Sequence, residues 1–275
     1  MREIDCLGIF REDDHSPGRV SDDHAVLEAV ASRMASLRGF NVSLARPDEL
    51  ANGVIQRLAP DVIFYMCEEA GPLDAIESAD APVKVNSVRG VKNTFRENIC
   101  RIFSGRAFFP GSCMTAPDFP DIPAGMAGNV WVKRGDYHAV EPGDVQFAGT
   151  AERLEELLRE FKRRGIGSVM LQKNVSGDLI KFYGVADRWF RWFYHMEHEA
   201  QGHPVDEGAL RRECGYAAEL AEVEVYGGDA IVSSDGSVHI IDLNAWPSFA
   251  LFRDEAAGHI AAHIASRAEK EVKSG

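Results

Sequence analysis

Short apolar runs and helical stripes alternate along the first third of the chain. Between Ser21 and Gly39 the apolar residues recur every three to four positions, which predicts a helix with one buried face. A shorter helix is predicted at residues 48–58, and the apolar runs predict strands at residues 4–10, 41–45, 61–67 and 82–86. Strands that alternate with helices are typical of βαβ units, so we expect a parallel sheet.

A different helix signal follows the fourth strand. Thr94 and Glu97 have the spacing of a capping box, so a helix is expected to begin there and to end at Gly105. Its apolar residues are expected to face inward. Its basic residues, Arg96 and Arg101, are expected on the helix surface.

A loop rich in proline and glycine at residues 110–128 leads into a region rich in strands. Helices are predicted at residues 152–164 and 205–223, and strands at residues 129–133, 169–173, 179–185, 186–194, 228–233 and 237–243. Asp235-Gly236 is a hairpin turn signal between the last two strands. The predicted fold class is therefore α/β followed by α+β.

Composition narrows the classes of function. The chain has 275 residues, with 30 Lys and Arg against 43 Asp and Glu, and its formal net charge is -13. An acidic surface argues against a nucleic-acid partner, because phosphate contacts need basic side chains. Five cysteines without Cys-x-x-Cys spacing favour a reduced, cytoplasmic protein. No apolar run approaches the roughly 18 residues of a membrane span, so neither secretion nor a membrane partner is expected.

The last predicted hairpin carries the clearest candidate chemistry. Asp229 is expected to start one strand, and Asp242 and Asn244 to end its neighbour, so the three side chains are expected to meet at one end. Hard oxygen ligands near phosphates suit Mg²⁺. Asp and Asn are also common in turns and at strand ends, so a purely structural role stays open for this segment.

Two further strands end in, or carry, single cations. Residues 130–133 form an apolar run that ends in Lys133, and the loop at residues 134–144 has the glycines and charges of a phosphate cover. Residues 169–175 run through a turn at residues 176–178 into a strand that carries Lys181. Either lysine could also be an ordinary solvated surface residue.

These segments together, in this order over nearly the whole chain, resemble the ATP-grasp superfamily. This is the fold of glutathione synthetase, D-alanine-D-alanine ligase and the ribosomal-protein glutamate ligases. The resemblance implies a Rossmann-like domain at residues 1–85, followed by two subdomains at residues 86–173 and 174–275 that hold ATP between them. It implies ATP and Mg²⁺ as cofactors.

The resemblance also implies roles for single residues. Residues 86–92 are similar to the family's entry into the first subdomain, where Lys92 would reach phosphate. Lys133 resembles the second phosphate-binding lysine, and Lys181 the catalytic basic residue near the terminal phosphate. Gln172, Lys173 and Val175 resemble the connection that contacts adenine, and Asp178 resembles the ribose ligand. The residues that resemble the metal ligands are Asp229, Asp242 and Asn244.

One departure from the family pattern concerns the reaction. Most members have Glu-x-Asn where this chain has Asp242 and Asn244, and the following Trp-Pro is also similar to the inositol polyphosphate kinases on this fold. We expect a carboxylate-amine ligase that acts through an acylphosphate. A small-molecule kinase and a non-catalytic nucleotide-binding regulator remain alternatives. The expected partners are a small-molecule or peptide acceptor and, in a homodimer, a second copy of the chain.

Several other polar residues have no assigned role. His195, His198 and His203 lack the spacing of a zinc site, and an acceptor-binding role for them stays open. His259 and His263 lie four positions apart in a terminal helix and are expected to face solvent. The loop at residues 11–19 follows the first strand, where open α/β sheets place ligands, and is the best N-terminal candidate for the second substrate.

Overall fold

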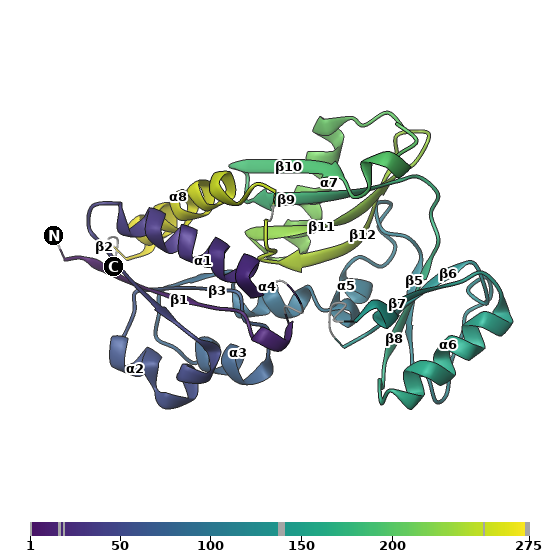
Figure 1. Cartoon of the computed structure of the whole chain (residues 1–275), viewed down its shortest axis with the longest axis horizontal. Helices are drawn as coiled ribbons and strands as arrows, with labels where there is room; N and C mark the ends of the chain where they lie inside the picture. Colours follow the sequence, from purple (N-terminus) through teal and green to yellow (C-terminus); the bar gives the residue numbers. More distant parts are fainter. Residues whose placement is uncertain (1, 16–17, 19, 137–140, 250, 273–275) are drawn as a thin grey trace.

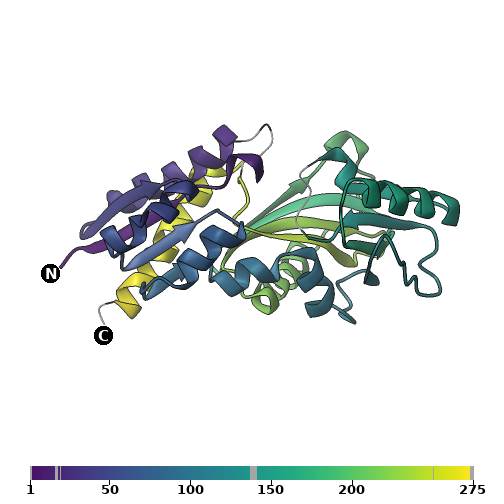
Figure 2. The same ribbon diagram turned by 90° about the horizontal axis from the view of Figure 1, so that it is seen from below.

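We describe a computed structural model of the chain, covering residues 2–15, 18, 20–136, 141–249 and 251–272. The described part of the chain forms three four-stranded sheets. Figures 1 and 2 show an elongated molecule, with the first sheet at one end, the second at the other and the third between them. The mixed α/β architecture confirms the predicted fold class.

The first sheet is parallel and has the strand order β2-β1-β3-β4. Its strands are β1 (Ile4–Ile9), β2 (Phe40–Ala45), β3 (Val62–Tyr65) and β4 (Val83–Val85). One face packs on α1 (Val20–Ala35), whose apolar stripe is buried as predicted. The other face packs on α2 (Val54–Leu58) and α3 (Ala70–Glu77). The carboxyl ends of the strands therefore meet at one edge.

The second sheet is antiparallel, with the order β5-β8-β6-β7. Its strands are β5 (Ser112–Thr115), β6 (Val130–Arg134), β7 (Val145–Ala148) and β8 (Val169–Lys173). One face is covered by α6 (Ala151–Arg163), which begins where the Thr150 hydroxyl accepts a hydrogen bond from the Arg153 amide. The buried residues of α6 recur at helical spacing, as predicted: Leu154, Leu157, Leu158 and Phe161.

The third sheet is also antiparallel, with the order β10-β9-β11-β12. Its strands are β9 (Asp178–Val185), β10 (Trp189–Tyr194), β11 (Val225–Val232) and β12 (Val238–Ala245), and α7 (Glu207–Ala221) packs against it. The predicted hairpin turn is confirmed, because Gly236 adopts a left-handed conformation with φ 82° between β11 and β12.

The helix predicted from Thr94 to Gly105 is α5 (Arg96–Ile102), which is shorter at both ends. A further short helix that was not predicted, α4 (Val88–Asn93), precedes it and is capped by Ser87. Thr94 ends α4, and its hydroxyl donates to the Val91 carbonyl at 2.7 Å, so the predicted capping box is wrong. The helix predicted at residues 48–58 is divided into a 3-10 helix (Pro47–Asn52) and α2.

Each sheet lies within one of the three residue ranges proposed as domains, 1–85, 86–173 and 174–275. One helix, however, packs against a sheet of another range. The last helix, α8 (Arg253–Glu271), lies beside α1 and shares the core of the first sheet, although it follows the third sheet in the chain (Figure 1). His263 on α8 is 9% exposed and bonds to Glu224, so the expectation that it faces solvent is wrong. None of the described helices combines the length and the apolar character that a bilayer crossing demands.

Candidate functional site

The predicted oxygen ligands meet on one face of the β11-β12 hairpin. Asp229 lies directly opposite Asp242, and Asn244 lies two residues further along β12, opposite Gly227. Opposite partners and residues two apart share a face of a sheet, so the three side chains point the same way. Asp229 lies within β11, because the strand begins at Val225; the expectation that Asp229 starts the strand is wrong.

Two lysines from neighbouring strands join these carboxylates. Lys181 on β9 lies opposite Asp229, and its Nζ is 2.6 Å from Asp229 Oδ1. Lys133 is the fourth residue of β6, and its Nζ donates to the Ile241 carbonyl at 2.8 Å. Lys133 thus connects the second sheet to the strand that carries Asp242. The structure therefore brings two of the three predicted phosphate-site lysines to the predicted metal ligands.

The environment of Lys133 changes its acidity. The side chain is buried, and this burial lowers the pKa of Lys133 from 10.5 to about 8. The carboxylate of Asp242 raises this pKa, the guanidinium of Arg96 lowers it further, and Asp229 raises it. The ammonium group is therefore held between opposing charges in a site with little water.

Arg96 is the site residue that the sequence prediction missed. Its side chain is 2% exposed, its guanidinium lies 3.5 Å from Asp242 Oδ2, and it donates to the Arg134 carbonyl at 3.0 Å. The expected surface position is wrong. Arg96 has helical spacing with three other buried residues: Ile99, Cys100 and Phe103. This spacing was the signal in the sequence that could have placed Arg96 on the buried face.

Lys92 makes its contacts elsewhere. Its Nζ lies 3.1 Å from Glu77 Oε2 and 3.6 Å from Asp74 Oδ1, both on α3. The hydrogen bond that Lys92 donates to Glu77 raises the pKa of Lys92. From this segment of the chain, the cation beside the carboxylates is therefore Arg96, while the described contacts of Lys92 tie α4 to α3.

The residues predicted to contact adenine lie where the second sheet leads into the third. Gln172 on β8 is 1% exposed, and its amide nitrogen has no hydrogen-bond partner among the described residues. It lies opposite Trp131, whose ring centroid is 5.3 Å from that of Phe147. Lys173 is exposed and Val175 half-buried. This face of the second sheet thus combines a buried amide with partly exposed aromatic rings.

Asp178 has a structural task. Its two carboxylate oxygens accept hydrogen bonds from the backbone amides of Gln201 and His203 at 2.6 and 2.7 Å. Burial raises its pKa, but these hydrogen bonds outweigh that effect and the pKa is lowered. Both oxygens therefore hold the loop that follows β10, so the structure gives the expected ribose role no support.

The histidines of that loop are not part of a metal cluster. His195 and His198 are exposed, and His203 is half-buried. Within the described ranges, no three His, Cys, Asp or Glu side chains are grouped so that they could hold a metal ion. The candidate site on the β11-β12 hairpin differs from such a group, because its third predicted oxygen ligand is the side-chain amide of Asn244.

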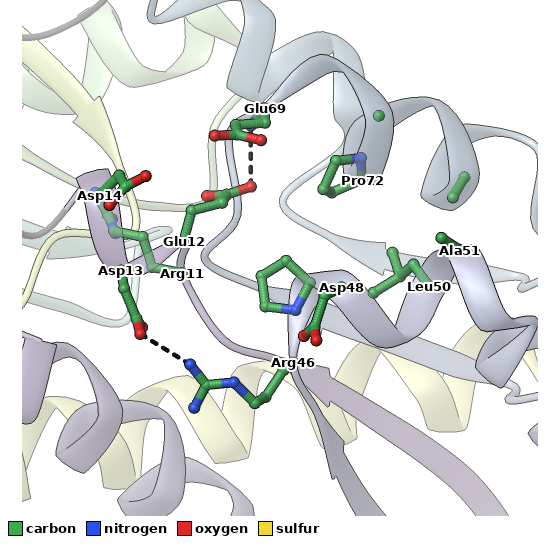
Figure 3. A pocket seen from close by; sticks show the side chains of 13 residues that line it. Arg11, Glu12, Asp13, Asp14, Arg46, Asp48, Leu50, Ala51, Glu69 and Pro72 are labelled. Atoms are coloured by element: carbon green, nitrogen blue, oxygen red, sulfur yellow. Dashed lines mark hydrogen bonds and ion pairs between the residues drawn. The ribbon is translucent and has the colours of Figure 1, made fainter.

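A cavity of about 550 Å³ lies at the carboxyl edge of the first sheet (Figure 3). It is lined by residues that follow β1, β2 and β3, including Arg11, Glu12, Arg46 and Glu69. Glu12 accepts hydrogen bonds from the backbone amides of Glu68 and Glu69, while burial raises its pKa. The predicted ligand position of the loop at residues 11–19 thus coincides with a cavity, although residues 16, 17 and 19 lie outside the described residues.

The predicted phosphate cover is described only at its two ends. Arg134 donates to Asp136 at 2.7 Å, and Asp144 is buried and paired with Arg164. Residues 137–140 lie outside the described residues.

Comparison with known proteins gives structural neighbours only. No protein-family model and no curated protein matches the chain. The chain is similar to D-alanine-D-alanine ligase from Bacillus anthracis, with a TM-score of 0.70 and 12% identity over 99% of this chain and 100% of the other. The same enzyme complexed with ATP matches with a TM-score of 0.68 and 11% identity, over 99% of this chain and 100% of the other. The D-alanine-D-alanine ligase from Coxiella burnetii matches with a TM-score of 0.70 and 11% identity, over 100% of this chain and 96% of the other. The chain therefore has the ATP-grasp fold, as the sequence predicted.

Proposed function

We propose that this protein is an ATP-dependent ligase that activates a carboxylate as an acylphosphate and joins it to an amine. The observation that carries the proposal is the group of charges between the second and third sheets, in a fold shared with ligases of which one is complexed with ATP. The group combines three cations with three oxygen ligands: Lys133, Lys181 and Arg96 with Asp229, Asp242 and Asn244.

The oxygen ligands fit Mg²⁺. Carboxylate and amide oxygens are the donors that this hard cation prefers, and those of Asp229, Asp242 and Asn244 lie on one face of two paired strands. The side chains of Asp229 and Asp242 are 27% and 17% exposed, so solvent and a nucleotide can reach them. When bound, the metal would neutralise phosphate charge and align the polyphosphate.

The cations have separate roles in the proposal. Lys181 would exchange its contact with Asp229 for an oxygen of the transferred phosphoryl group. Lys133 would hold another phosphate oxygen from the second sheet. Arg96 contacts Asp242, so it would keep that carboxylate in position. Positioning and charge neutralisation are what phosphoryl transfer needs most from a protein.

The adenine base of ATP would lie at the connection between the second and third sheets. The buried amide of Gln172 is available as a donor, and backbone groups of residues 173–175 are close to it along the chain. Lys92 and Asp178 are not included in this nucleotide site, because their described contacts are with other parts of the protein.

The proposed reaction has two steps. A carboxylate oxygen of the acceptor attacks the γ-phosphorus, and the bond from that phosphorus to the bridging oxygen breaks, releasing ADP with the electron pair. The amine then attacks the carbonyl carbon of the acylphosphate, phosphate leaves, and the amine nitrogen loses a proton. The cavity at the edge of the first sheet is the candidate acceptor site, for a small molecule or a peptide.

Trapping the acylphosphate tests the ligase proposal. The protein is incubated with ATP and Mg²⁺, once with pooled carboxylates and hydroxylamine and once with pooled polyols. From the carboxylate pool we expect a hydroxamate that depends on ATP. A phosphorylated polyol without hydroxamate would instead favour the kinase, which the Asp-x-Asn-Ala-Trp-Pro sequence at residues 242–247 keeps as second candidate. ADP release that stays at background with both pools would indicate a nucleotide-binding regulator.

Substitution of the metal ligands tests the site itself. Asp242→Ala and Asn244→Ala should each abolish Mg-ATP turnover while the circular dichroism spectrum stays that of the wild type. Asp235→Ala is the matched control, since Asp235 lies at the turn of the same hairpin and its described hydrogen bonds are with Ser237, away from the candidate ligands. Wild-type turnover in both ligand variants would reject the metal assignment.

A further inference from the structure

Arg11 connects the first sheet to the strand that carries the candidate metal ligands. It follows β1, and its guanidinium donates to the carbonyl of Trp246 at 2.7 Å, although 235 positions separate the two residues. Trp246 comes directly after β12, two residues beyond Asn244. No other residue that lines the cavity has a described bond to this part of the chain.

The guanidinium is also fixed by acids of the first domain. Arg11 Nε lies 3.5 Å from Asp23 Oδ2 on α1, and its NH1 lies 3.3 Å from Glu68 Oε1 after β3. All three side chains are 10% exposed or less. A buried arginine held by two carboxylates has little rotational freedom, so its third bond is aimed at a defined position.

Trp246 needs such support. Its φ of 41° is in the left-handed region, which non-glycine residues rarely adopt. Three contacts hold it: the bond from Arg11, the bond from its own amide to the Val225 carbonyl at 2.9 Å, and the stacking of its ring on Phe64 at 6.2 Å. Residues in this conformation persist only where the surroundings fix them, and they are common at functional sites.

We infer that Arg11 is a positioning residue, which holds the corner after β12 and thereby places Asn244 for metal binding. The inference rests on the proposed function. Because Arg11 also lines the cavity (Figure 3), it gives the candidate acceptor site a direct mechanical connection to the metal site. A ligand that displaces the guanidinium would change metal affinity, and the reverse holds by linkage.

Binding of Mn²⁺ in the presence of a non-hydrolysable ATP analogue, followed by electron paramagnetic resonance, tests this inference on the full chain. Arg11→Met should weaken Mn²⁺ binding about ten-fold, the scale of one charged hydrogen bond. Arg11→Lys keeps one donor and should give an intermediate value. Affinity for the analogue in EDTA should stay within about two-fold of wild type, because Arg11 has no described contact with Lys133, Lys181 or Arg96; a merely structural defect would lower both affinities.

Arg253→Met is the matched control. Arg253 also joins the last part of the chain to α1, through Asp22 at 2.6 Å, but it does not contact Trp246. Wild-type Mn²⁺ affinity in Arg11→Met, or an equal loss in Arg253→Met, would overturn the inference. If Arg11→Met does not fold, Arg11→Lys decides in the same way. A wild-type protein that binds neither Mn²⁺ nor the analogue would refute the proposed function, and with it the inference; normal wild-type binding together with an unaffected Arg11→Met would refute the inference alone.

Discussion

Burial lowers the pKa of Lys133 to about 8, so the charge of this ammonium varies with pH in a range where ordinary lysines stay protonated. A phosphate group binds the charged form, so nucleotide affinity should fall as the pH rises from 7 to 9, by about ten-fold if only that form binds. Isothermal titration calorimetry with an ATP analogue measures this change. Near pH 8 the same titrations in buffers of different ionisation enthalpy should reveal proton uptake.

Lys133→Met is the control for that experiment. It should bind the analogue more weakly at pH 7 and lose the pH dependence, since the group whose charge changes in this range has been removed. A wild-type affinity that is constant from pH 7 to 9 would contradict the proposed contact between Lys133 and phosphate.

Arg96 gives a second prediction at the scale of the residue. Arg96→Met removes the guanidinium beside Asp242, and we expect turnover to fall by about 30- to 100-fold, because hydrogen bonds to charged groups contribute about 2 to 3 kcal/mol. Arg101→Met, on the same helix, is matched to it: Arg101 is exposed and bonds only to Asn98 in the described structure. Equal turnover in the two variants, measured as ADP release, would show that Arg96 has no part in the site.

At the scale of the element, two helical glycines give opposite predictions. A Cβ at Gly90 on α4 would lie 2.2 Å from the Glu222 carbonyl oxygen, so Gly90→Ala must displace α4 from the turn before β11. We expect a loss of about 1 to 3 kcal/mol in the free energy of unfolding. Gly258 on α8 has nothing within 4 Å of such a Cβ, and Gly258→Ala should gain about 0.5 to 1 kcal/mol. Urea unfolding measures both; a Gly90→Ala protein as stable as wild type would exclude the close approach.

The elements also show which patterns were readable in the sequence. The stripes of α1 and α6 and the turn of the β11-β12 hairpin are local signals, and they predicted those elements. The edge strands β5 and β7 were not predicted. Each has four residues, most of them only partly buried, so neither shows an alternation of buried and exposed positions. Helix α3 was also not predicted. Its first residues include Gly71 and Pro72, and a Gly-Pro pair in a sequence usually indicates a loop.

The residues of the candidate site also divide into those that local sequence patterns predicted and those that depend on tertiary structure. Asp229, Asp242, Asn244 and Lys181 lie on paired strands of the third sheet, and the predicted hairpin was sufficient to group the three oxygen ligands. Lys133 lies on the second sheet and reaches β12 through its bond to the Ile241 carbonyl, so only the family resemblance placed it with them.

Arg96 has helical spacing with the buried Ile99, Cys100 and Phe103 wherever the helix begins. It was assigned to the surface because arginine is rarely buried unless it is paired, and its partner Asp242 is distant in the sequence. The contacts of Lys92 with α3 likewise depend on tertiary structure. Asp178 was assigned by likeness to a family motif, and only the tertiary structure shows its bonds to the loop after β10.

At the scale of the whole molecule, α8 returns from the third sheet to the core of the first. It is also held to the third sheet, because Glu224, just before β11, accepts from His263 Nε2 at 2.8 Å and from Arg267 at 2.6 Å. The Glu224 amide donates to Asn86 at the start of the second proposed range. Residues from the second and third proposed ranges therefore meet around Glu224, and two of them lie on the helix that packs against the first sheet. Glu224 is thus a test of how these parts stabilise one another.

Glu224→Gln should lower the free energy of unfolding by about 1 to 2 kcal/mol at pH 7, the scale of a charged hydrogen bond in a partly exposed position. Burial raises the pKa of Glu224, but the bonds from His263 and Arg267 outweigh it and the pKa is lowered below 4.5. A carboxylate with a lowered pKa stabilises fully above its unfolded value and loses this effect as the pH falls through its folded value. The difference in the free energy of unfolding between wild type and Glu224→Gln, measured with urea, should therefore be constant from pH 7 to about 5 and shrink below pH 4.5.

Glu271→Gln is the control, because it removes the more exposed partner of Arg267; it should change the free energy of unfolding by less than about 0.5 kcal/mol. A difference that persists unchanged at pH 3.5 would show that the charge of Glu224 does not hold α8 to the third sheet.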